Sequence, residues 1–180
     1  MNIDKAIHVK DLVKFYGKTQ ALFGVDLEVK RGEVYGFLGL NGAGKRTTIR
    51  CMLDLIRPQS GSISMLGINP QEEPEAVKER VGYLPGELHV DENMTPKQIF
   101  RYFNRLRGNR SDWDFIEELS KRLKLELNTP IKNFSKGNKQ KVGVVQALMH
   151  KPELLLLDEP TGGLDPLMQQ EVLSMLAEAQ

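Results

Sequence analysis

The residues best suited to chemistry form a glycine-rich run that ends in a lysine. Glycines let successive backbone N–H groups converge on an anion, because no Cβ blocks the approach. The lysine adds a compact positive charge that can lie along the β- and γ-phosphates of a nucleotide. The run reads Gly39-Leu40-Asn41-Gly42-Ala43-Gly44-Lys45. The candidate phosphate-binding residues are Asn41, Gly42, Ala43, Gly44, Lys45, Arg46, Thr47 and Thr48.

The residue after the lysine departs from the usual pattern of such loops. A serine or threonine normally stands there and ligates Mg²⁺ through its hydroxyl, but this chain has Arg46. Thr47 is a poor substitute, because one step along a helix rotates the side chain by roughly 100°. We expect Arg46 to weaken Mg²⁺ binding and to add positive charge near the phosphates.

Two carboxylates near the end of the chain could complete such a site. Asp158 and Glu159 directly follow Leu154–Leu157, an apolar run that is typical of a buried parallel strand. An aspartate at such a strand end can hold Mg²⁺ through its water shell. The neighbouring glutamate can orient or deprotonate an attacking water. We therefore interpret Asp158 as the metal residue, and Glu159 and Lys45 as the catalytic residues.

A phosphate-binding run of this kind requires a strand before it and a helix after it. Val34–Leu38 is apolar and predicts a buried strand, while Ile49, Met52 and Leu53 have the spacing of a helix over 47–55. Hydrophobic periodicity predicts the remaining elements of this part of the chain. They are strands over 7–15, 25–29, 62–66 and 81–84, and a short helix over 73–80.

The middle of the chain is predicted to be helical. Thr95 has the features of an N-cap, with Pro96 at the first helical position and Gln98 as its capping-box partner. Ser111 and Ser135 are predicted to cap two further helices. The pattern favours an α/β fold with a helical insert over roughly residues 87–150.

A last helix is predicted to start at Asp165-Pro166, which combine an N-cap with proline at the first helical position. The residues predicted to face inward are Leu167, Val172, Leu173 and Leu176.

Composition gives no sign of a polyanionic partner or a membrane span. The net charge is +1, from 25 Lys and Arg against 24 Asp and Glu, so no nucleic-acid partner is predicted. No apolar run has the length of a membrane span, and the first residues lack the apolar core of a signal peptide. The single cysteine, Cys51, is predicted to be a small core residue. One local cluster is either a solvated helix face or an interaction face: Arg101, Arg105, Arg107 and Arg110.

Together with these residues, three further segments resemble the ATP-binding-cassette (ABC) family of transporter ATPases. Phe134–Asn138, followed by Lys139–Lys141, resembles the family signature, which usually reads LSGGQ. Pro160–Asp165 resembles the D-loop. Tyr16, on the turn after the first predicted strand, matches the aromatic residue that stacks on adenine, and a flat ring suits a flat base. The resemblance covers essentially the whole chain.

The resemblance implies a P-loop NTPase (RecA-like) core with an N-terminal antiparallel β subdomain and an inserted helical subdomain. Residues 1–86 and 151–180 would form the β/α core and residues 87–150 the helical subdomain, within one incomplete nucleotide-binding domain, residues 1–180. ATP and Mg²⁺ are the implied cofactors. Ser135 and Gly137, at the start of a helix, would offer a hydroxyl and N–H groups to a phosphate.

The resemblance also implies how such a protein acts. Two subunits, identical or different, would form a head-to-tail dimer with ATP between the phosphate loop of one and the signature of the other. ATP would close the dimer, hydrolysis would open it, and the helical subdomain would pass the motion to a membrane-embedded permease. The protein would be cytoplasmic and peripheral on the inner face of the cell membrane.

Two features besides Arg46 differ from the family pattern. The family usually has glutamine where this chain has Gly86, so a polar side chain that reaches for metal and water is lost. The family also has a switch histidine downstream of the D-loop, whereas His8, His89 and His150 all precede Asp158. We therefore expect a C-terminally truncated domain with little hydrolysis of its own.

Three functional hypotheses follow. The first is an ATP-hydrolysing subunit of a bacterial ABC transporter, of the exporter type. The second is a degenerate subunit that binds nucleotide with little turnover, and Arg46 favours it. The third is a soluble ABC ATPase of translation or DNA repair, which would carry a second cassette or a long coiled coil, and neither pattern is present in the sequence.

Overall fold

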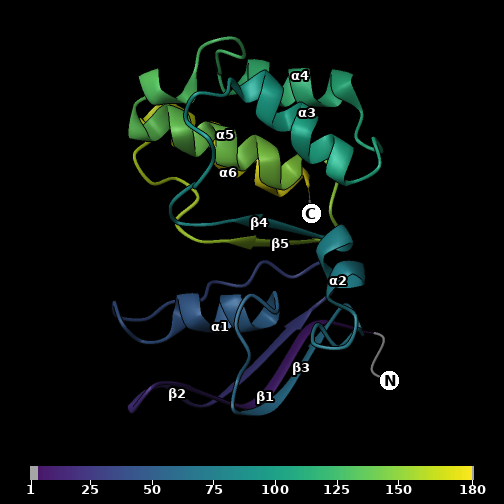
Figure 1. Cartoon of the computed structure of the whole chain (residues 1–180), viewed down its shortest axis with the longest axis vertical. Coiled ribbons are helices and arrows are strands. Elements are labelled where there is room, and N and C mark those ends of the chain that lie inside the picture. The colour runs from purple at the N-terminus through teal and green to yellow at the C-terminus, as the bar shows by residue number, and fades with distance from the viewer. Residues whose placement is uncertain (1–3, 180) are drawn as a thin grey trace. The chain divides into compact units, whose positions relative to one another are not determined.

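The computed structural model describes residues 4–179, which fold as two compact units. The first unit runs to Arg80 and the second from Val81 to Ala179, and Figure 1 traces both along the chain. Each unit has its own sheet and its own buried side chains. Within the described range, no helix combines the length and the apolar character needed to cross a membrane.

The first unit is built on an antiparallel sheet. Its elements are β1 (Lys5–Tyr16), β2 (Thr19–Lys30), α1 (Lys45–Met52), β3 (Ser60–Met65) and α2 (Pro74–Arg80). The strand order is β2-β1-β3, and β1 pairs antiparallel with both neighbours. The hairpin between β1 and β2 closes where Tyr16 pairs with Thr19. The strands predicted over 7–15, 25–29 and 62–66 and the helices over 47–55 and 73–80 are therefore confirmed, with shifted ends.

Alternating burial gives this sheet an apolar face. Leu27 and Val29 of β2 are buried while Asp26 and Glu28 are exposed, as the two-residue period of a strand requires. Helix α1 packs against β2 and β3 (Figure 1). Its buried residues are Thr48, Ile49, Cys51 and Met52. Cys51 is thus confirmed as a core residue, and burial raises the pKa of its thiol.

The buried strand predicted over Val34–Leu38 is absent from the structure. Residues 33–40 are in neither helix nor strand, and Val34 and Leu38 are 78% and 90% exposed. A strand is stabilised by ladder hydrogen bonds to a neighbour, and the described sheets, β2-β1-β3 and β4-β5, do not include this segment. Instead the N–H of Leu38 bonds locally to the carbonyl of Gly36, at 3.1 Å.

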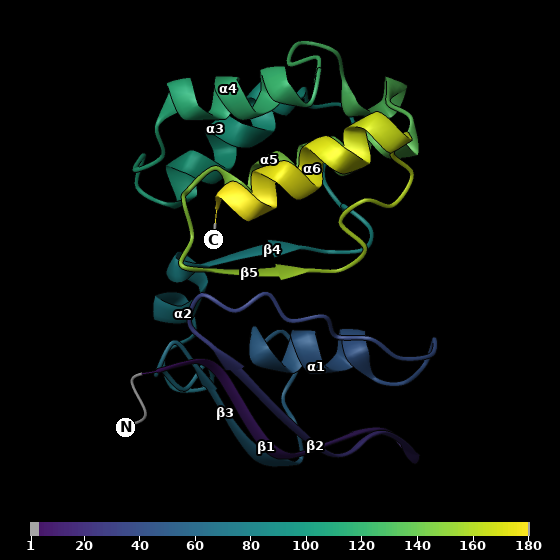
Figure 2. The ribbon, with the colours of Figure 1, turned by 180° about the vertical axis from the view of Figure 1, so that it is seen from behind.

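The second unit places its long helices on one side of a two-stranded parallel sheet (Figure 2). Its elements are β4 (Val81–Leu84), α3 (Pro96–Leu106), α4 (Trp113–Arg122), the 3₁₀ turn η1 (Ile131–Asn133), α5 (Lys136–Leu148), β5 (Leu154–Leu157) and α6 (Pro166–Glu178). The two strands pair in parallel from Val81 opposite Leu154 to Leu84 opposite Leu157. Fully buried residues of its core include Leu84, Phe100, Ile116, Leu123, Val142 and Val172.

The helix caps confirm two predictions and correct one. Thr95 and Gln98 form the predicted capping box at α3, and Ser135 caps α5 by accepting from the N–H of Asn138. Helix α4, however, is capped by Asp112, whose carboxylate accepts from the N–H of Asp114. The predicted cap, Ser111, lies one residue before this cap, and its N–H donates to the side chain of Asn104 at 2.9 Å.

The last helix is confirmed, and two of the four residues predicted to face inward do so: Val172 is buried and Leu176 packs against the core. Leu167 and Leu173 are 70% and 56% exposed, not inward-facing. The buried residues of α6 are Met168, Val172 and Met175, which recur at the four- and seven-residue spacing of one helix face. The strand before it also differs from its prediction, because only Leu156 of Leu154–Leu157 is buried and the other three residues are partly exposed.

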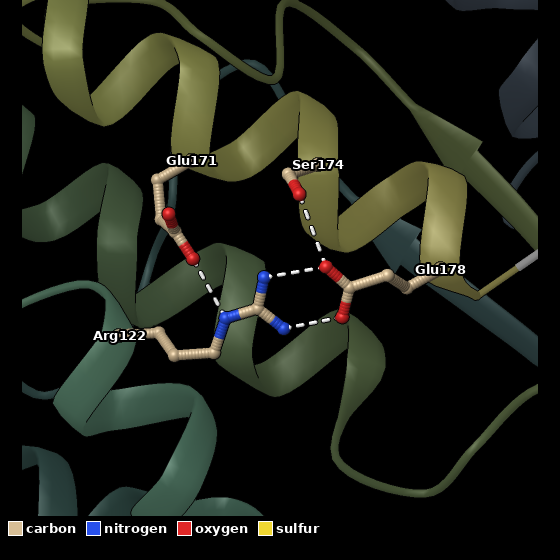
Figure 3. Close-up of polar contacts among 4 residues, drawn as sticks. All are labelled: Arg122, Glu171, Ser174 and Glu178. Atoms are coloured by element: carbon tan, nitrogen blue, oxygen red, sulfur yellow. Dashed lines mark hydrogen bonds and ion pairs between the residues drawn. The ribbon is translucent and has the colours of Figure 1, made fainter.

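An ionic network joins α4 to α6 (Figure 3). The Nε of Arg122 donates to Glu171 at 2.6 Å, and its two terminal nitrogens donate to the carboxylate of Glu178 at 2.5 and 2.7 Å. Ser174 donates to the same carboxylate of Glu178 at 3.0 Å. These contacts lower the pKa of Glu178 and raise that of Arg122.

Candidate functional site

In the first unit, the end of the glycine-rich loop is shaped by Gly44. Gly44 has a φ of 88°, in the left-handed region that glycine adopts readily. A Cβ on Gly44 would lie 2.5 Å from Cδ2 of Leu22 and 2.8 Å from the carbonyl oxygen of Ala21. Only glycine therefore lets the loop pass this closely over the start of β2 and turn directly into α1.

The side chain of Lys45 folds back onto the glycine-rich loop and bonds to its backbone. Its Nζ donates to the carbonyls of Gly39 at 2.5 Å and Leu40 at 2.9 Å. The N–H of Ala43 also donates to the carbonyl of Leu40, at 3.1 Å. The ammonium group therefore lies against the loop itself.

Helix α1 begins at Lys45 and has no side-chain cap. Its first backbone bond runs from the N–H of Thr48 to the carbonyl of Gly44, at 2.8 Å, so the N–H groups before Thr48 lie outside the helical ladder. Such an N-terminus attracts anions through these N–H groups and the helix dipole. The loop and the start of α1 therefore have the features of a phosphate site.

The three hydroxyl and cationic side chains at the helix start differ in exposure. Arg46 is exposed, Thr47 is partly buried, and Thr48 is fully buried. The hydroxyl of Thr48 donates back to the carbonyl of Gly44, at 3.0 Å, so its proton is used within the helix. The predicted binding residues 41–48 thus lie on one continuous loop and helix start, with different groups available to a ligand.

Tyr16 lies at the end of β1, on the hairpin that leads into β2. Its side chain is 46% exposed, and the Nζ of Lys14 lies 5.6 Å from its ring centroid. An exposed ring with a cation beside it can offer a face to a flat base.

In the second unit, Asp158 and Glu159 follow β5 directly. The N–H of Asp158 donates to the carbonyl of Leu84, at 2.9 Å, and so extends the pairing of β4 with β5. Asp158 is partly buried and Glu159 is exposed. Among residues 4–179, no three His, Cys, Asp or Glu side chains are grouped closely enough to hold a metal by themselves. A metal at Asp158 would therefore need water or phosphate oxygens as its other ligands.

The backbone of Glu159 has an unusual conformation. Its φ of 53° is in the left-handed region, which costs a non-glycine residue about 1–2 kcal/mol. Its carbonyl accepts from the N–H of Gly162 at 3.0 Å and from the side-chain amide of Gln140 at 2.9 Å. Sequence reasoning missed Gln140, although a polar side chain on the otherwise apolar face of a helix is a usable signal.

Ser135 and Gly137 lie at the start of α5, close to the loop after β5. The Ser135 hydroxyl accepts from the N–H of Asn138 at 3.2 Å. Gly137 is buried, and a Cβ there would lie 2.5 Å from the carbonyl oxygen of Gly163. The predicted signature and D-loop segments of this chain are therefore in direct contact within the second unit.

Each unit thus contains part of the predicted nucleotide-binding and catalytic residues. The first unit joins Lys45 to the loop before it, and the second joins Glu159 to α5. A glycine-rich loop before an uncapped helix and acidic residues at the end of a parallel strand are two features of P-loop NTPases, although the strand expected before the loop is not formed. The model of the ABC transporter family matches residues 22–162, and the chain belongs to this family.

Individual proteins support this assignment. The ABC transporter ATP-binding protein NatA of Bacillus subtilis (strain 168) is 43% identical over 151 residues, which are 81% of this chain and 61% of NatA. The bacitracin transport ATP-binding protein BcrA of Bacillus licheniformis is 38% identical over 168 residues, 92% of this chain and 55% of BcrA. The chain therefore spans somewhat more than half the length of these relatives.

A solved structure described as an ATP-binding subunit of an ABC transporter is similar over 97% of this chain and 74% of its own, with 34% identity and a TM-score of 0.88. These likenesses confirm the predicted family and the predicted P-loop NTPase fold with its antiparallel β part.

Proposed function

We propose that this chain is the ATP-binding and ATP-hydrolysing part of an ABC transporter. Members of the family are ATPases that bind ATP, generally with Mg²⁺. The observation that carries the proposal is the uncapped start of α1 after the left-handed Gly44, with the ammonium of Lys45 on the adjoining loop. This arrangement suits the phosphates of a nucleotide better than any uncharged ligand.

The phosphates would be held by Asn41–Thr48. Backbone N–H groups would bind their oxygens, and Lys45 would exchange its bonds to the Gly39 and Leu40 carbonyls for bonds to the β- and γ-phosphates. Tyr16 would stack on the base. Arg46 would add charge at the outer side of the helix start.

The second unit would supply the groups that act on water and metal. Glu159, an exposed carboxylate, would orient the attacking water and take its proton. Asp158 would bind Mg²⁺ through one oxygen or a water, which fits an ion that keeps several of its waters. When bound, Mg²⁺ would neutralise charge that develops on the phosphates. Because Arg46 lacks the usual hydroxyl, Asp158 would be the protein residue that holds the ion.

The wider assembly is also a proposal. The two units would belong to one nucleotide-binding domain, with residues 1–86 and 151–180 as its β/α core and 87–150 as its helical subdomain. Ser135 and Gly137 would face the ATP of a second subunit in a head-to-tail dimer. The protein would act at the cytoplasmic side of the membrane through a permease.

A nucleotide titration with and without Mg²⁺, on the protein and on Arg46→Thr, tests the proposal. We expect ATP to bind the unchanged protein with little dependence on Mg²⁺, because a fixed positive charge opposes the ion by several kcal/mol before relaxation. Arg46→Thr should restore a strong Mg²⁺ dependence and faster hydrolysis. Lys45→Ala is the negative control, and ATP binding unaffected by Lys45→Ala would contradict the phosphate site.

A degenerate subunit that binds ATP with little turnover is the second candidate function. The exposed arginine at the start of α1 favours it. Steady-state ATPase activity with Mg²⁺ separates the two candidates, because the degenerate form would bind ATP and leave it intact. If the Arg46 protein binds Mg·ATP far more tightly than free ATP and turns it over, the degenerate candidate is wrong.

A further inference from the structure

We propose that Gln140 is a positioning residue that holds the backbone of Glu159 in the conformation needed for hydrolysis. The inference rests on the proposed ATPase function of Glu159. Gln140 and Glu159 both belong to the second unit, and Gln140 lies outside the phosphate loop and outside the acidic strand end.

The contact itself is specific. Gln140 lies one turn into α5, and its side chain is 6% exposed. Its Nε2 donates to the carbonyl oxygen of Glu159 at 2.9 Å, across 19 positions of sequence. A buried amide is tolerated when it finds a partner, and the partner here is the backbone of the candidate catalytic residue.

The Glu159 carbonyl has two donors. Besides Gln140, it accepts from the N–H of Gly162 at 3.0 Å. Together they fix the peptide plane that follows Glu159, and with it the left-handed conformation at a φ of 53°. A disfavoured backbone conformation of this kind persists only where surrounding contacts hold it. The hydrogen bond from Gln140 therefore helps to fix the direction in which the Glu159 side chain points from the loop.

The same loop touches α5 at a second point. A Cβ on Gly137 would lie 2.5 Å from the carbonyl oxygen of Gly163, so the two backbones are in contact with no room between them. Gly162 lies under the carboxylate, because a Cβ there would be 3.9 Å from Oε2 of Glu159. The start of α5 thus contacts the Glu159–Gly163 loop at both ends. A displacement of α5 would therefore move Glu159 directly.

The test uses Gln140→Met, which keeps the length of the side chain and removes its N–H donors. Loss of one hydrogen bond should speed amide exchange of Gly162 by about five- to tenfold. Exchange of Asp158, which pairs with Leu84, should stay unchanged. Turnover of ATP should fall by about tenfold, with the KM for ATP within about twofold of its original value, because the phosphate loop is unaltered.

Two further variants make the result specific. Gln146→Met makes the same chemical change two turns along α5 and should behave as the unchanged protein. Gln140→Glu can donate to the Glu159 carbonyl only when its carboxyl is protonated. Its turnover relative to that of the unchanged protein should therefore rise as the pH is lowered, which a loss of packing would not produce.

The outcomes separate this inference from the proposed function. If Gly162 exchange is the same in Gln140→Met and Gln146→Met, the inference is wrong whatever the turnover. If exchange rises but turnover is equal in these two variants while Glu159→Gln abolishes it, the positioning role is also wrong. If Glu159→Gln retains full turnover, the catalytic assignment of Glu159 fails, and the exchange result still decides whether Gln140 holds the loop.

Discussion

At the scale of residues, two glycines of the candidate site are required for different reasons. Gly44 has a φ of 88° and lies against Leu22 and Ala21, so both its conformation and its surroundings exclude a side chain. Gly137 is helical, and a side chain is excluded there only because its Cβ would lie 2.5 Å from the carbonyl oxygen of Gly163. A motif alone presents both as phosphate-binding glycines, whereas the structure adds a packing requirement to each.

Tyr16 is the residue whose proposed role depends most on its exposure. We expect Tyr16→Ala to weaken ATP binding by about 1–3 kcal/mol, the range for one stacked base, and Tyr16→Trp to be tolerated. Tyr102→Ala, which removes another exposed ring on α3, is the matched control. The measurement is a fluorescent-nucleotide titration of the three variants, and equal affinities throughout would show that the Tyr16 ring does not contact the base.

At the scale of elements, the helices of the second unit are joined by polar contacts as well as by their core. Arg122 of α4 holds Glu171 and Glu178 of α6, and Gln140 of α5 holds the loop that leads to α6. Arg122 forms a bidentate ion pair with Glu178, and two parallel hydrogen bonds are stronger than one. Helix α6 is therefore fixed at its middle and its C-terminal end, beyond the burial of Met168, Val172 and Met175.

Removal of this ionic network should destabilise the second unit modestly. We expect Arg122→Gln to lower the free energy of unfolding by about 1 kcal/mol, since the side chains are partly exposed and screened. Arg122→Lys should recover less than half of the loss, because lysine lacks the planar fork. Urea denaturation at low and high salt checks this, with Arg105→Gln on α3 as the matched charge change. If the loss of unfolding free energy in Arg122→Gln is the same at low and high salt, lost packing and not lost charge pairing is its cause.

At the scale of the whole molecule, the two units have separate cores and sheets, and each has its own buried polar groups. His150, after α5, bonds through Nε2 to the carbonyl of Val81 at 3.2 Å, and its Nδ1 is buried with no hydrogen-bond partner among residues 4–179. Burial, with a smaller contribution from the nearby Arg107, lowers the pKa of His150 to about 4. The neutral imidazole is therefore part of the native second unit.

This group makes stability depend on pH. The unfolded chain takes up a proton at His150 near its ordinary pKa of 6.5, whereas the folded chain resists protonation down to about pH 4. The free energy of unfolding is therefore unaffected by protonation of His150 above pH 6.5, and it falls as the pH is lowered from about 6.5 to about 4. We expect His150→Gln to flatten the fall of the urea midpoint there, and the exposed His89→Gln to leave it unchanged. Parallel pH profiles for both variants would contradict this.

Much of this protein is determined by local sequence. The capping box at Thr95, the cap at Ser135 and the turn at Gly44 are specified by neighbouring residues, because each involves groups a few positions apart. Alternation along β2 and β3 likewise predicts strands, whereas their antiparallel arrangement is implied by the family resemblance. The glycine-rich loop and the acidic strand end indicate the family through their residue types and spacing alone.

What local sequence could not decide depends on partners that are distant along the chain. Val34–Leu38 has the composition of a strand, but a strand requires a neighbour, and the described sheets provide none. The cap of α4 is Asp112 and not Ser111, and the N–H of Ser111 instead donates to Asn104, seven residues earlier. Gln140 holds Glu159 through a buried bond that spans 19 positions, so only the tertiary structure brings the donor and the acceptor together.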